Sequence, residues 1–372
     1  MRAPRRRTET VRQFILNHAG EHPGDISRIT GQTFGISRQS VAKHLESLVG
    51  QGLLRATGRT KGREYRLEAL FDHTFEVNAG AGMAENQIWR QEVAPRVIGT
   101  QDGSQPQISE NVLEICQFGF TEILNNVAAH GGSSTALVRV QGTAVNTKIM
   151  VSDQGVGIFN KLQNEFGMQD SRHALLELVK GKLTTRPESH TGEGIFYTSG
   201  MFDRFSIISG SLFYRRSRQN GFAPAGVSSG NWGNWKIEAE DLNQVSGTTV
   251  FMEIHPKAKH TVQGLFDRHA GDAGGLGFNL TQVPVKLARY DGEQLVSRSQ
   301  SRRLTARLDR FKEVVLDFQD VATIGQSFAD EVFRVYAGGH PETRLSWINT
   351  QPKITQMIQR VRSNTLAQLT TA

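Results

Sequence analysis

The sequence predicts a multidomain α/β protein, and three observations support this fold class. The 372 residues are enough for two or three domains with their own hydrophobic cores. Helical patterns dominate the first 50 residues, whereas helical and strand-like patterns alternate through most of the rest. Residues 1–70 carry 13 Lys or Arg and 6 Asp or Glu, a net charge of +7, which equals the formal net charge of the whole chain. We therefore predict a basic N-terminal domain followed by α/β domains without net charge.

Charge and composition also narrow the class of protein. A basic domain beside a neutral remainder is expected where one domain meets an anion such as nucleic acid. No run of about 18 apolar residues exists, so no membrane-spanning helix is expected. The basic start is followed by no apolar signal core, and Cys116 is the only cysteine. These features predict a cytoplasmic protein without an internal disulfide.

The N-terminal region is predicted to form three helices and a two-stranded ribbon. Helices are expected over 8–18, from Asp25 to about Thr30, and over 38–52, with Ser37 as the cap of the third. Two short strands then flank a basic, glycine-containing turn. This arrangement, with ISRQSVAKHLESLVGQGLL before the ribbon, resembles the winged helix-turn-helix domain of bacterial regulators and covers residues 1–70.

The winged-helix resemblance implies DNA as a partner. In that family the third helix enters the major groove and the wing touches the backbone. The residues that the resemblance places near bases or phosphates are Ser37, Arg38, Gln39, Ser40, Lys43, Arg59, Lys61 and Arg63. The alternative is a protein-interaction module whose basic face is only solvated.

The central region carries the most informative motifs. A long amphipathic helix is predicted over 111–130, and Glu122, Asn126 and His130 recur on one of its faces at intervals of four residues. Further on, Asp153 follows an apolar run and begins the stretch DQGVG, where glycines let a backbone pass close to a flat ligand. The stretch TGEG at 191–194 then opens another helical pattern, where free amides can meet phosphate.

In order and spacing these motifs resemble the nucleotide-binding boxes of the GHKL ATPase superfamily, which has the Bergerat α/β sandwich fold. The resemblance covers residues 71–258 and implies ATP and Mg²⁺ as cofactors. It implies that Asn126 binds the metal, that Glu122 is the general base and that Asp153 accepts a hydrogen bond from the adenine amino group. The residues that it places around the base and the phosphates are Gly155, Gly157, Gly192, Gly194 and either Thr248 or Thr249.

The residue chemistry agrees with that resemblance. An Asn carbonyl is a hard oxygen ligand for Mg²⁺ that adds no negative charge beside phosphates, and a carboxylate can activate water or a hydroxyl. Each motif alone is weak, since Glu-x-x-x-Asn can be a solvated helical face. In GHKL proteins the interval 158–190 is the lid, where Lys180, Lys182 or Arg186 would reach the γ-phosphate. The alternative is that these three side chains belong to a solvated loop.

The C-terminal region, 281–372, shows alternating strands and helices after a predicted linker over 259–280. VPVKLARY is predicted as its first strand and EVVLDF as its second. The run EVVLDFQDVATIGQSFADEVFR resembles STAS-like domains related to anti-sigma-factor antagonists, which implies a protein partner. By that resemblance Ser327 is the phosphoacceptor, although Gly-Gln-Ser-Phe replaces the usual Asp-Ser-Ser-Gly. The alternative is that Ser327 is a helix N-cap.

Together these resemblances predict an ATP-binding regulatory protein, a DNA-binding transcriptional regulator switched by Mg·ATP. One alternative is a protein serine kinase of the anti-sigma-factor type, in which Glu122 activates a hydroxyl such as that of Ser327. Another is a GHKL ATPase with slow hydrolysis. A homodimer is compatible with all three, and the sequence leaves the oligomeric state open.

Overall fold

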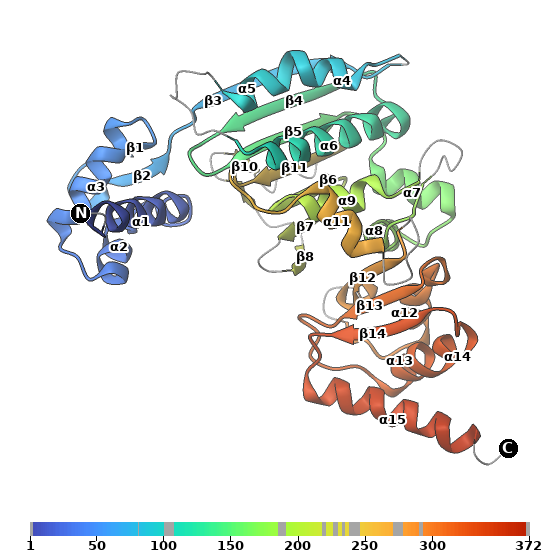
Figure 1. Ribbon diagram of the computed structural model, residues 1–372. Helices are drawn as coiled ribbons and strands as arrows, with labels where there is room; N and C mark the ends of the chain where they lie inside the picture. The colour runs from blue at the N-terminus through green and yellow to red at the C-terminus, as the bar shows by residue number, and fades with distance from the viewer. Residues whose placement is uncertain are drawn as a thin grey trace.

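The computed structural model shows a mixed α/β protein built around a seven-stranded sheet (Figure 1). The described residues are 3–80, 82–99, 108–184, 191–217, 221–225, 230–232, 235–237, 246–270, 278–289 and 293–369. Among the described helices, none has the length and apolar character needed to cross a membrane.

The N-terminal part contains three helices and a two-stranded antiparallel sheet, as predicted. The helices are α1 (Ala3–His18), α2 (Ile26–Phe34) and α3 (Arg38–Gly50), and the strands are β1 (Leu54–Thr57) and β2 (Glu64–Leu67). Ser37 caps α3, because its side chain accepts a hydrogen bond from the amide of Ser40. The buried faces of the helices form a separate hydrophobic core.

The central sheet is antiparallel throughout and has the strand order β3-β4-β5-β11-β6-β7-β8. Its strands are β3 (Phe71–Asn78), β4 (Thr135–Gly142), β5 (Thr147–Asp153), β6 (Arg204–Ser209), β7 (Leu212–Ser217), β8 (Gly221–Ala225) and β11 (Thr248–Ile254). A separate two-stranded sheet pairs β9 (Gly230–Trp232) with β10 (Trp235–Ile237). The central sheet presents alternate residues to its helical layer, so that β4 and β5 contribute Val138, Val140, Ile149 and Val151 to the core.

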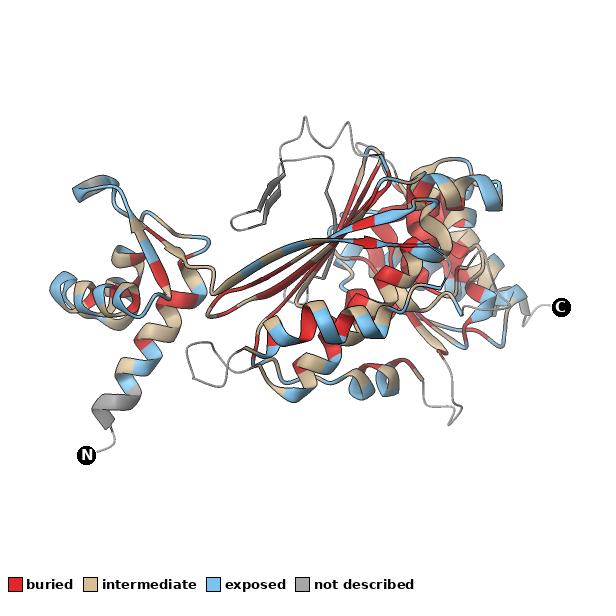
Figure 2. Cartoon of the chain, turned by 90° about the horizontal axis from the view of Figure 1, so that it is seen from above, coloured by how far each residue is buried: buried red, intermediate tan, exposed pale blue. Residues whose placement is uncertain are grey.

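Helices cover one face of this sheet, as seen from above in Figure 2. They are α4 (Glu85–Ile88), α5 (Ala94–Ile98), α6 (Glu110–Asn126), α7 (Ile158–Phe166), α8 (Ser171–Lys180), α9 (Gly194–Met201) and α11 (Val262–Ala270). One π-helical turn, Trp89–Val93, joins α4 to α5, and another, Val127–Gly131, extends α6. The close packing of α6 on the end of α9 requires Gly119, because a Cβ there would overlap the ring of Phe202.

The C-terminal part is a parallel three-stranded sheet in the order β12-β13-β14 with crossover helices. Its strands are β12 (Leu280–Pro284), β13 (Glu313–Asp317) and β14 (Arg344–Ile348), and its helices are α12 (Arg298–Thr305), α13 (Gln326–Asp330), α14 (Ala337–Gly339) and α15 (Pro352–Leu369).

Two predictions for this part need correction. The stretch predicted as a strand over 283–290 belongs to β12 only as far as Pro284, and a 3₁₀ turn, Val285–Ala288, follows it. Proline has no amide hydrogen to continue the ladder, which accounts for the end of the strand. The predicted linker over 259–280 contains α11, whose Leu265 and His269 are buried.

The three parts are joined by defined contacts. The tip of the β4–β5 hairpin inserts Val145 into the N-terminal core, and Arg204 of β6 pairs with Glu21 at 3.0 Å. The central and C-terminal parts share one continuous hydrophobic cluster, which extends from Val77 to Val361. The C-terminal part is therefore packed against the central part through a common core.

Candidate functional site

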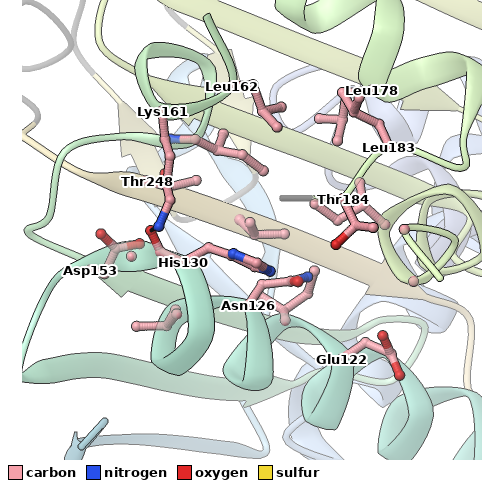
Figure 3. A pocket seen from close by; sticks show the side chains of 18 of the residues that line it. Glu122, Asn126, His130, Asp153, Lys161, Leu162, Leu178, Leu183, Thr184 and Thr248 are labelled. Carbon is pink, nitrogen blue, oxygen red and sulfur yellow. Dashed lines mark hydrogen bonds between the residues drawn. The ribbon is translucent and has the colours of Figure 1, made fainter. Parts of the chain in front are cut away.

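A cavity of about 280 Å³ lies beside the sheet, between α6, the ends of β5 and β11, and the residues before and after 185–190. Figure 3 shows Asp153 and Glu122 at opposite ends of this pocket, with Asn126 and His130 between them. Apolar side chains form much of its wall: Ile123, Val127, Val151, Ile158, Leu162, Leu178, Leu183, Ile195 and Val250. A pocket with apolar walls and a few convergent polar groups suits an organic ligand with a flat apolar part and polar ends.

At one end of the pocket, Asp153 ends strand β5 and is only 3% exposed. The amide of Gly155 donates to its Oδ1 at 2.8 Å. Burial raises the pKa of the Asp153 carboxyl, although the amides of Gly155 and Thr248 act in the opposite direction. A buried acceptor at the edge of a cavity can recognise a ligand amino group.

The two glycines after Asp153 shape its loop and do not line the cavity. A Cβ at Gly155 would overlap the carbonyl of Gly131, at the end of the α6 extension. Gly157 has φ +82° and precedes α7 as its N-cap, and a Cβ there would come within 2.6 Å of Ser209 Oγ. Both positions need glycine so that the loop carrying Asp153 can lie against its neighbours.

Helix α6 carries Glu122 and Asn126, and its π-helical extension carries His130. All three residues line the pocket, as their spacing predicts. The Nδ2 atom of Asn126 is buried and has no hydrogen-bond partner among the described residues. Because the two heteroatoms of a carboxamide are assigned from their partners, Asn126 can present either its oxygen or its nitrogen to a ligand. A buried carboxamide end without a partner fits a site that a polar ligand completes.

Gly192 and Gly194 also line the cavity, at the start of α9. A Cβ at Gly192 would come within 2.6 Å of the backbone of Leu183, and one at Gly194 would overlap the carboxylate of Glu122. Glycine is therefore needed for Glu122 to reach the N-terminus of α9. That helix end offers amide groups and a positive partial charge to an anion.

The structure distinguishes the two threonines before strand β11. Thr248 lines the pocket, and its hydroxyl accepts a hydrogen bond from the amide of Ile158 at 2.9 Å. Thr249 points to the other face of the sheet, where its hydroxyl lies 2.7 Å from that of Ser152. Thr248 is thus the threonine with access to a ligand.

Sequence reasoning missed the part that Lys161 and Gly247 play at this site. Lys161 of α7 lines the pocket and donates to the carbonyl of His130 at 3.1 Å. Gly247 has φ +86°, and a Cβ there would overlap the backbone carbonyl of Asp153. The sequence signal for Gly247 is a glycine directly before a strand, whereas Lys161 has only its helical position after Gly157.

Metal binding at this site would depend on the ligand. Within the described ranges, no group of three or more His, Cys, Asp or Glu side chains is placed to hold a metal ion. A Mg²⁺ ion that arrives with phosphates needs few protein ligands, since phosphate oxygens and water complete its shell. Asn126 can supply such a ligand through its carbonyl oxygen.

The lysines predicted to reach a γ-phosphate have other partners. Lys180 is 1% exposed and donates to Glu177 Oε1 at 2.5 Å. Lys182 donates to the carbonyl of Arg310 at 2.9 Å. Arg186 lies outside the described residues. The prediction for Lys180 is therefore wrong, because its ammonium is enclosed by the C-terminal part.

The predicted DNA-binding residues lie on α3 and on the turn between β1 and β2. The exposed side chains are those of Ser37, Arg38, Gln39, Lys43, Arg59 and Arg63, whereas Ser40 is half-buried. The side chain of Lys61 lies outside the described part of the chain. The exposed cations on α3 and the turn give this part of the molecule a basic surface.

Ser327 is exposed as the second residue of α13. The N-cap of that helix is Gly325, so the alternative of Ser327 as a plain N-cap is wrong. An exposed hydroxyl in the first turn of a helix is a position where a phosphate would be favoured by the helix dipole.

The comparisons with known proteins concern the C-terminal part. No match was found among curated proteins. Residues 300–355 match the family model described as a STAS-like domain of unknown function (DUF4325). The matched range begins within α12 and includes β13, α13, α14 and β14. The chain therefore has a STAS-like domain at its C-terminal end.

Proposed function

We propose that this protein is an ATP-binding regulator in which the central α/β part is a GHKL-type nucleotide-binding domain and the N-terminal part is a winged helix that binds DNA. The observation that carries the ATP assignment is the pocket itself. It combines a buried carboxylate, Asp153, at one end with the buried, unpartnered Nδ2 of Asn126 and the α9 N-terminus toward the other. The order of these groups suits an adenine, a ribose and a phosphate chain.

Each residue has a definite task in this proposal. Asp153 accepts a hydrogen bond from the adenine amino group, while the apolar walls contact the faces of the base. Asn126 binds the Mg²⁺ ion through its carbonyl oxygen, and the amides at Gly192 and Gly194 meet the phosphates. The bound Mg²⁺ would offset the charge of the phosphates. Glu122 lies beside Gly194, where its carboxylate can act as a general base.

The DNA-binding role is supported by charge and by shape. The N-terminal 70 residues hold the whole formal excess of positive charge, and their exposed cations lie on α3 and the adjoining turn. A helix of this kind fits the major groove, with the β1–β2 turn beside the phosphate backbone. A duplex is therefore the proposed partner of this surface.

A second candidate function is a protein serine kinase. Two observations favour it: Glu122 lines the pocket, and the hydroxyl of Ser327 is exposed near the start of α13. Mass spectrometry of the protein after incubation with Mg·ATP separates the candidates, since phosphate on Ser327 indicates a kinase. Free phosphate released without modification of Ser327 indicates slow hydrolysis instead.

Calorimetry of the full-length protein with Mg·ATP tests the nucleotide site. We expect the wild type to bind and Asp153→Asn to weaken binding by about ten- to a hundred-fold, the cost of losing a hydrogen bond to a charged group. Asp317→Asn is a matched control, because Asp317 also ends a strand, is 2% exposed and accepts a hydrogen bond from the amide two residues later. Failure of the wild type to bind, or equal weakening by both substitutions, would contradict the proposal.

Fluorescence anisotropy with a labelled duplex tests the DNA partner. We expect binding by the full-length protein to weaken with salt, and Arg38→Ala with Lys43→Ala to reduce the logarithmic salt slope by about one unit for each lost phosphate contact. The control is Lys257→Ala with Lys259→Ala, which removes two exposed lysines after β11. If the control pair reduces binding as much as the α3 pair, then α3 is not the DNA-binding surface.

A further inference from the structure

Helix α8 is enclosed between the pocket and the STAS-like domain. Its residues Ala174 to Lys180 are all buried, although they include Glu177 and Lys180. A helix that is buried on every side must contact two different layers of the protein. Here one layer is the central part, and the other consists of β12 and the turn that follows it, which α8 contacts directly.

Lys180 binds the carbonyl groups at the C-terminal end of a helix in the STAS-like domain. Its ammonium donates to the carbonyl of Arg303 at 3.2 Å and to that of Ala306 at 2.8 Å, at the end of α12. The last carbonyls of a helix have no partner within the helix, and a cation there is favoured by the helix dipole. Glu177 balances the charge of Lys180, and Arg307 lies 3.9 Å from the second oxygen of Glu177.

The next residues continue this contact with the STAS-like domain. The hydroxyl of Thr281 donates to the carbonyl of Lys180 at 2.7 Å. Gly181 has φ +86°, and a Cβ there would overlap the ring of Phe278. Lys182 and Arg310 exchange hydrogen bonds, each side chain donating to the other's backbone carbonyl, at 2.9 and 3.2 Å.

Directly after Lys182 the same segment reaches the pocket. Leu183 and Thr184 line the cavity, and Gly192 packs closely on the backbone of Leu183. Residues 180–184, which we call the bridging segment, therefore contact the STAS-like domain at one end and the ligand site at the other. Figure 1 shows α8 between the sheet and the C-terminal part.

We propose that the bridging segment couples the pocket to the STAS-like domain, so that a ligand in the pocket changes the stability of α12 and the STAS-like domain in turn sets the ligand affinity. The coupling is reciprocal: if ligand binding stabilises α12, then the contacts that stabilise α12 strengthen ligand binding by the same free energy. This inference rests on the proposed function, which supplies ATP as the ligand. The contacts between the bridging segment and the STAS-like domain do not depend on which ligand the pocket binds. It makes the STAS-like domain an internal regulator of the pocket.

Hydrogen exchange of the full-length protein, with and without Mg·ATP, tests the coupling. The variant is Glu177→Gln with Lys180→Met, which removes both charges together and leaves neither one buried alone. Arg310→Ala is a second variant at an exposed residue, where we expect the fold to be kept even if the buried pair proves essential. Asp330→Asn with Arg334→Gln is the control, because it removes an ion pair inside the STAS-like domain.

In the wild type and the control we expect Mg·ATP to slow exchange in α12. The two bridging variants are Glu177→Gln with Lys180→Met and, separately, Arg310→Ala. In both we expect the slowing of exchange in α12 to fall to less than about half. We also expect their affinity for Mg·ATP to change by about five-fold or more, as for a typical allosteric coupling. Without nucleotide, we expect the bridging variants to exchange faster than the control at the amides of residues 191–197. An unchanged response in Arg310→Ala, with unchanged exchange at 191–197, would overturn the coupling.

The same experiment distinguishes failure of the nucleotide proposal from failure of the coupling. If the wild type binds no nucleotide, the comparison without nucleotide still decides the coupling, because it measures whether the STAS-like contacts stabilise the pocket. Faster exchange at 191–197 in the bridging variants then supports the coupling for another ligand. Equal exchange in the variants and the control contradicts it.

Discussion

At the scale of single residues, the pocket depends on glycines as much as on its polar groups. Gly155 and Gly247 lie against the backbone of Gly131 and of Asp153, where any side chain would overlap a carbonyl. The position of the Asp153 carboxylate thus depends on two glycines that are not among the residues lining the pocket. The glycines of DQGVG are therefore needed for the shape of the loop, and this loop in turn positions Asp153 at the pocket.

Substitution of Gly155 by alanine tests this view. We expect Gly155→Ala to lower the free energy of unfolding by about 2 kcal/mol, because the added Cβ must displace the end of the α6 extension. Urea denaturation followed by circular dichroism measures this change. Gly20→Ala is the control, since a Cβ at Gly20 meets nothing within 4 Å and should alter stability by less than about 0.5 kcal/mol. Equal stability of the two variants would show that the loop can move away without cost.

At the scale of elements, the sequence was most informative where the signals are local. The cap of α3 at Ser37 and the ribbon after it depend on residues within a few positions of one another, so pattern and propensity were sufficient. The helical spacing also predicted correctly that Glu122 and Asn126 share a face, and both line the pocket. Whether they bind nucleotide stays a prediction.

Other elements depend on partners far away in the chain. Sequence predicts that Lys180 either reaches a γ-phosphate or belongs to a solvated loop. Neither holds, because Lys180 is buried and its acceptors at Arg303 and Ala306 lie more than 120 residues later. The choice between Thr248 and Thr249 was likewise open until the strand register showed which one faces the pocket. Such features follow from tertiary packing, which a single sequence does not display.

At the scale of the whole molecule, the N-terminal and C-terminal parts contact the central part, which contains the pocket, in different ways. The N-terminal part meets the central sheet through the hairpin tip at Val145 and through the pair of Arg204 and Glu21. The STAS-like domain shares the core of the central part and contacts residues next to the cavity. A change in the pocket therefore reaches the STAS-like domain directly, whereas it reaches the basic surface only through the sheet.

The junction of the central and C-terminal parts also contains a buried histidine. His269 of α11 is 5% exposed, and its Nδ1 donates to the carbonyl of Leu280 at 3.0 Å. Its ring lies 4.8 Å from that of Phe196 and 5.8 Å from that of Phe278, measured between centroids. Burial among these rings lowers the pKa of His269 from 6.5 to about 4.

This lowered pKa predicts that the free energy of unfolding decreases as the pH falls. The unfolded chain binds a proton at His269 below pH 6.5, whereas the folded chain does so only near pH 4, so the folded state loses stability as the pH falls between these values. At pH 5 we expect His269 to account for a loss of about 2 kcal/mol relative to pH 7. Urea denaturation of the wild type and of His269→Phe at both pH values measures it. The variant should lose less stability on acidification by about that amount, and an identical loss in both proteins would show that His269 does not titrate with unfolding.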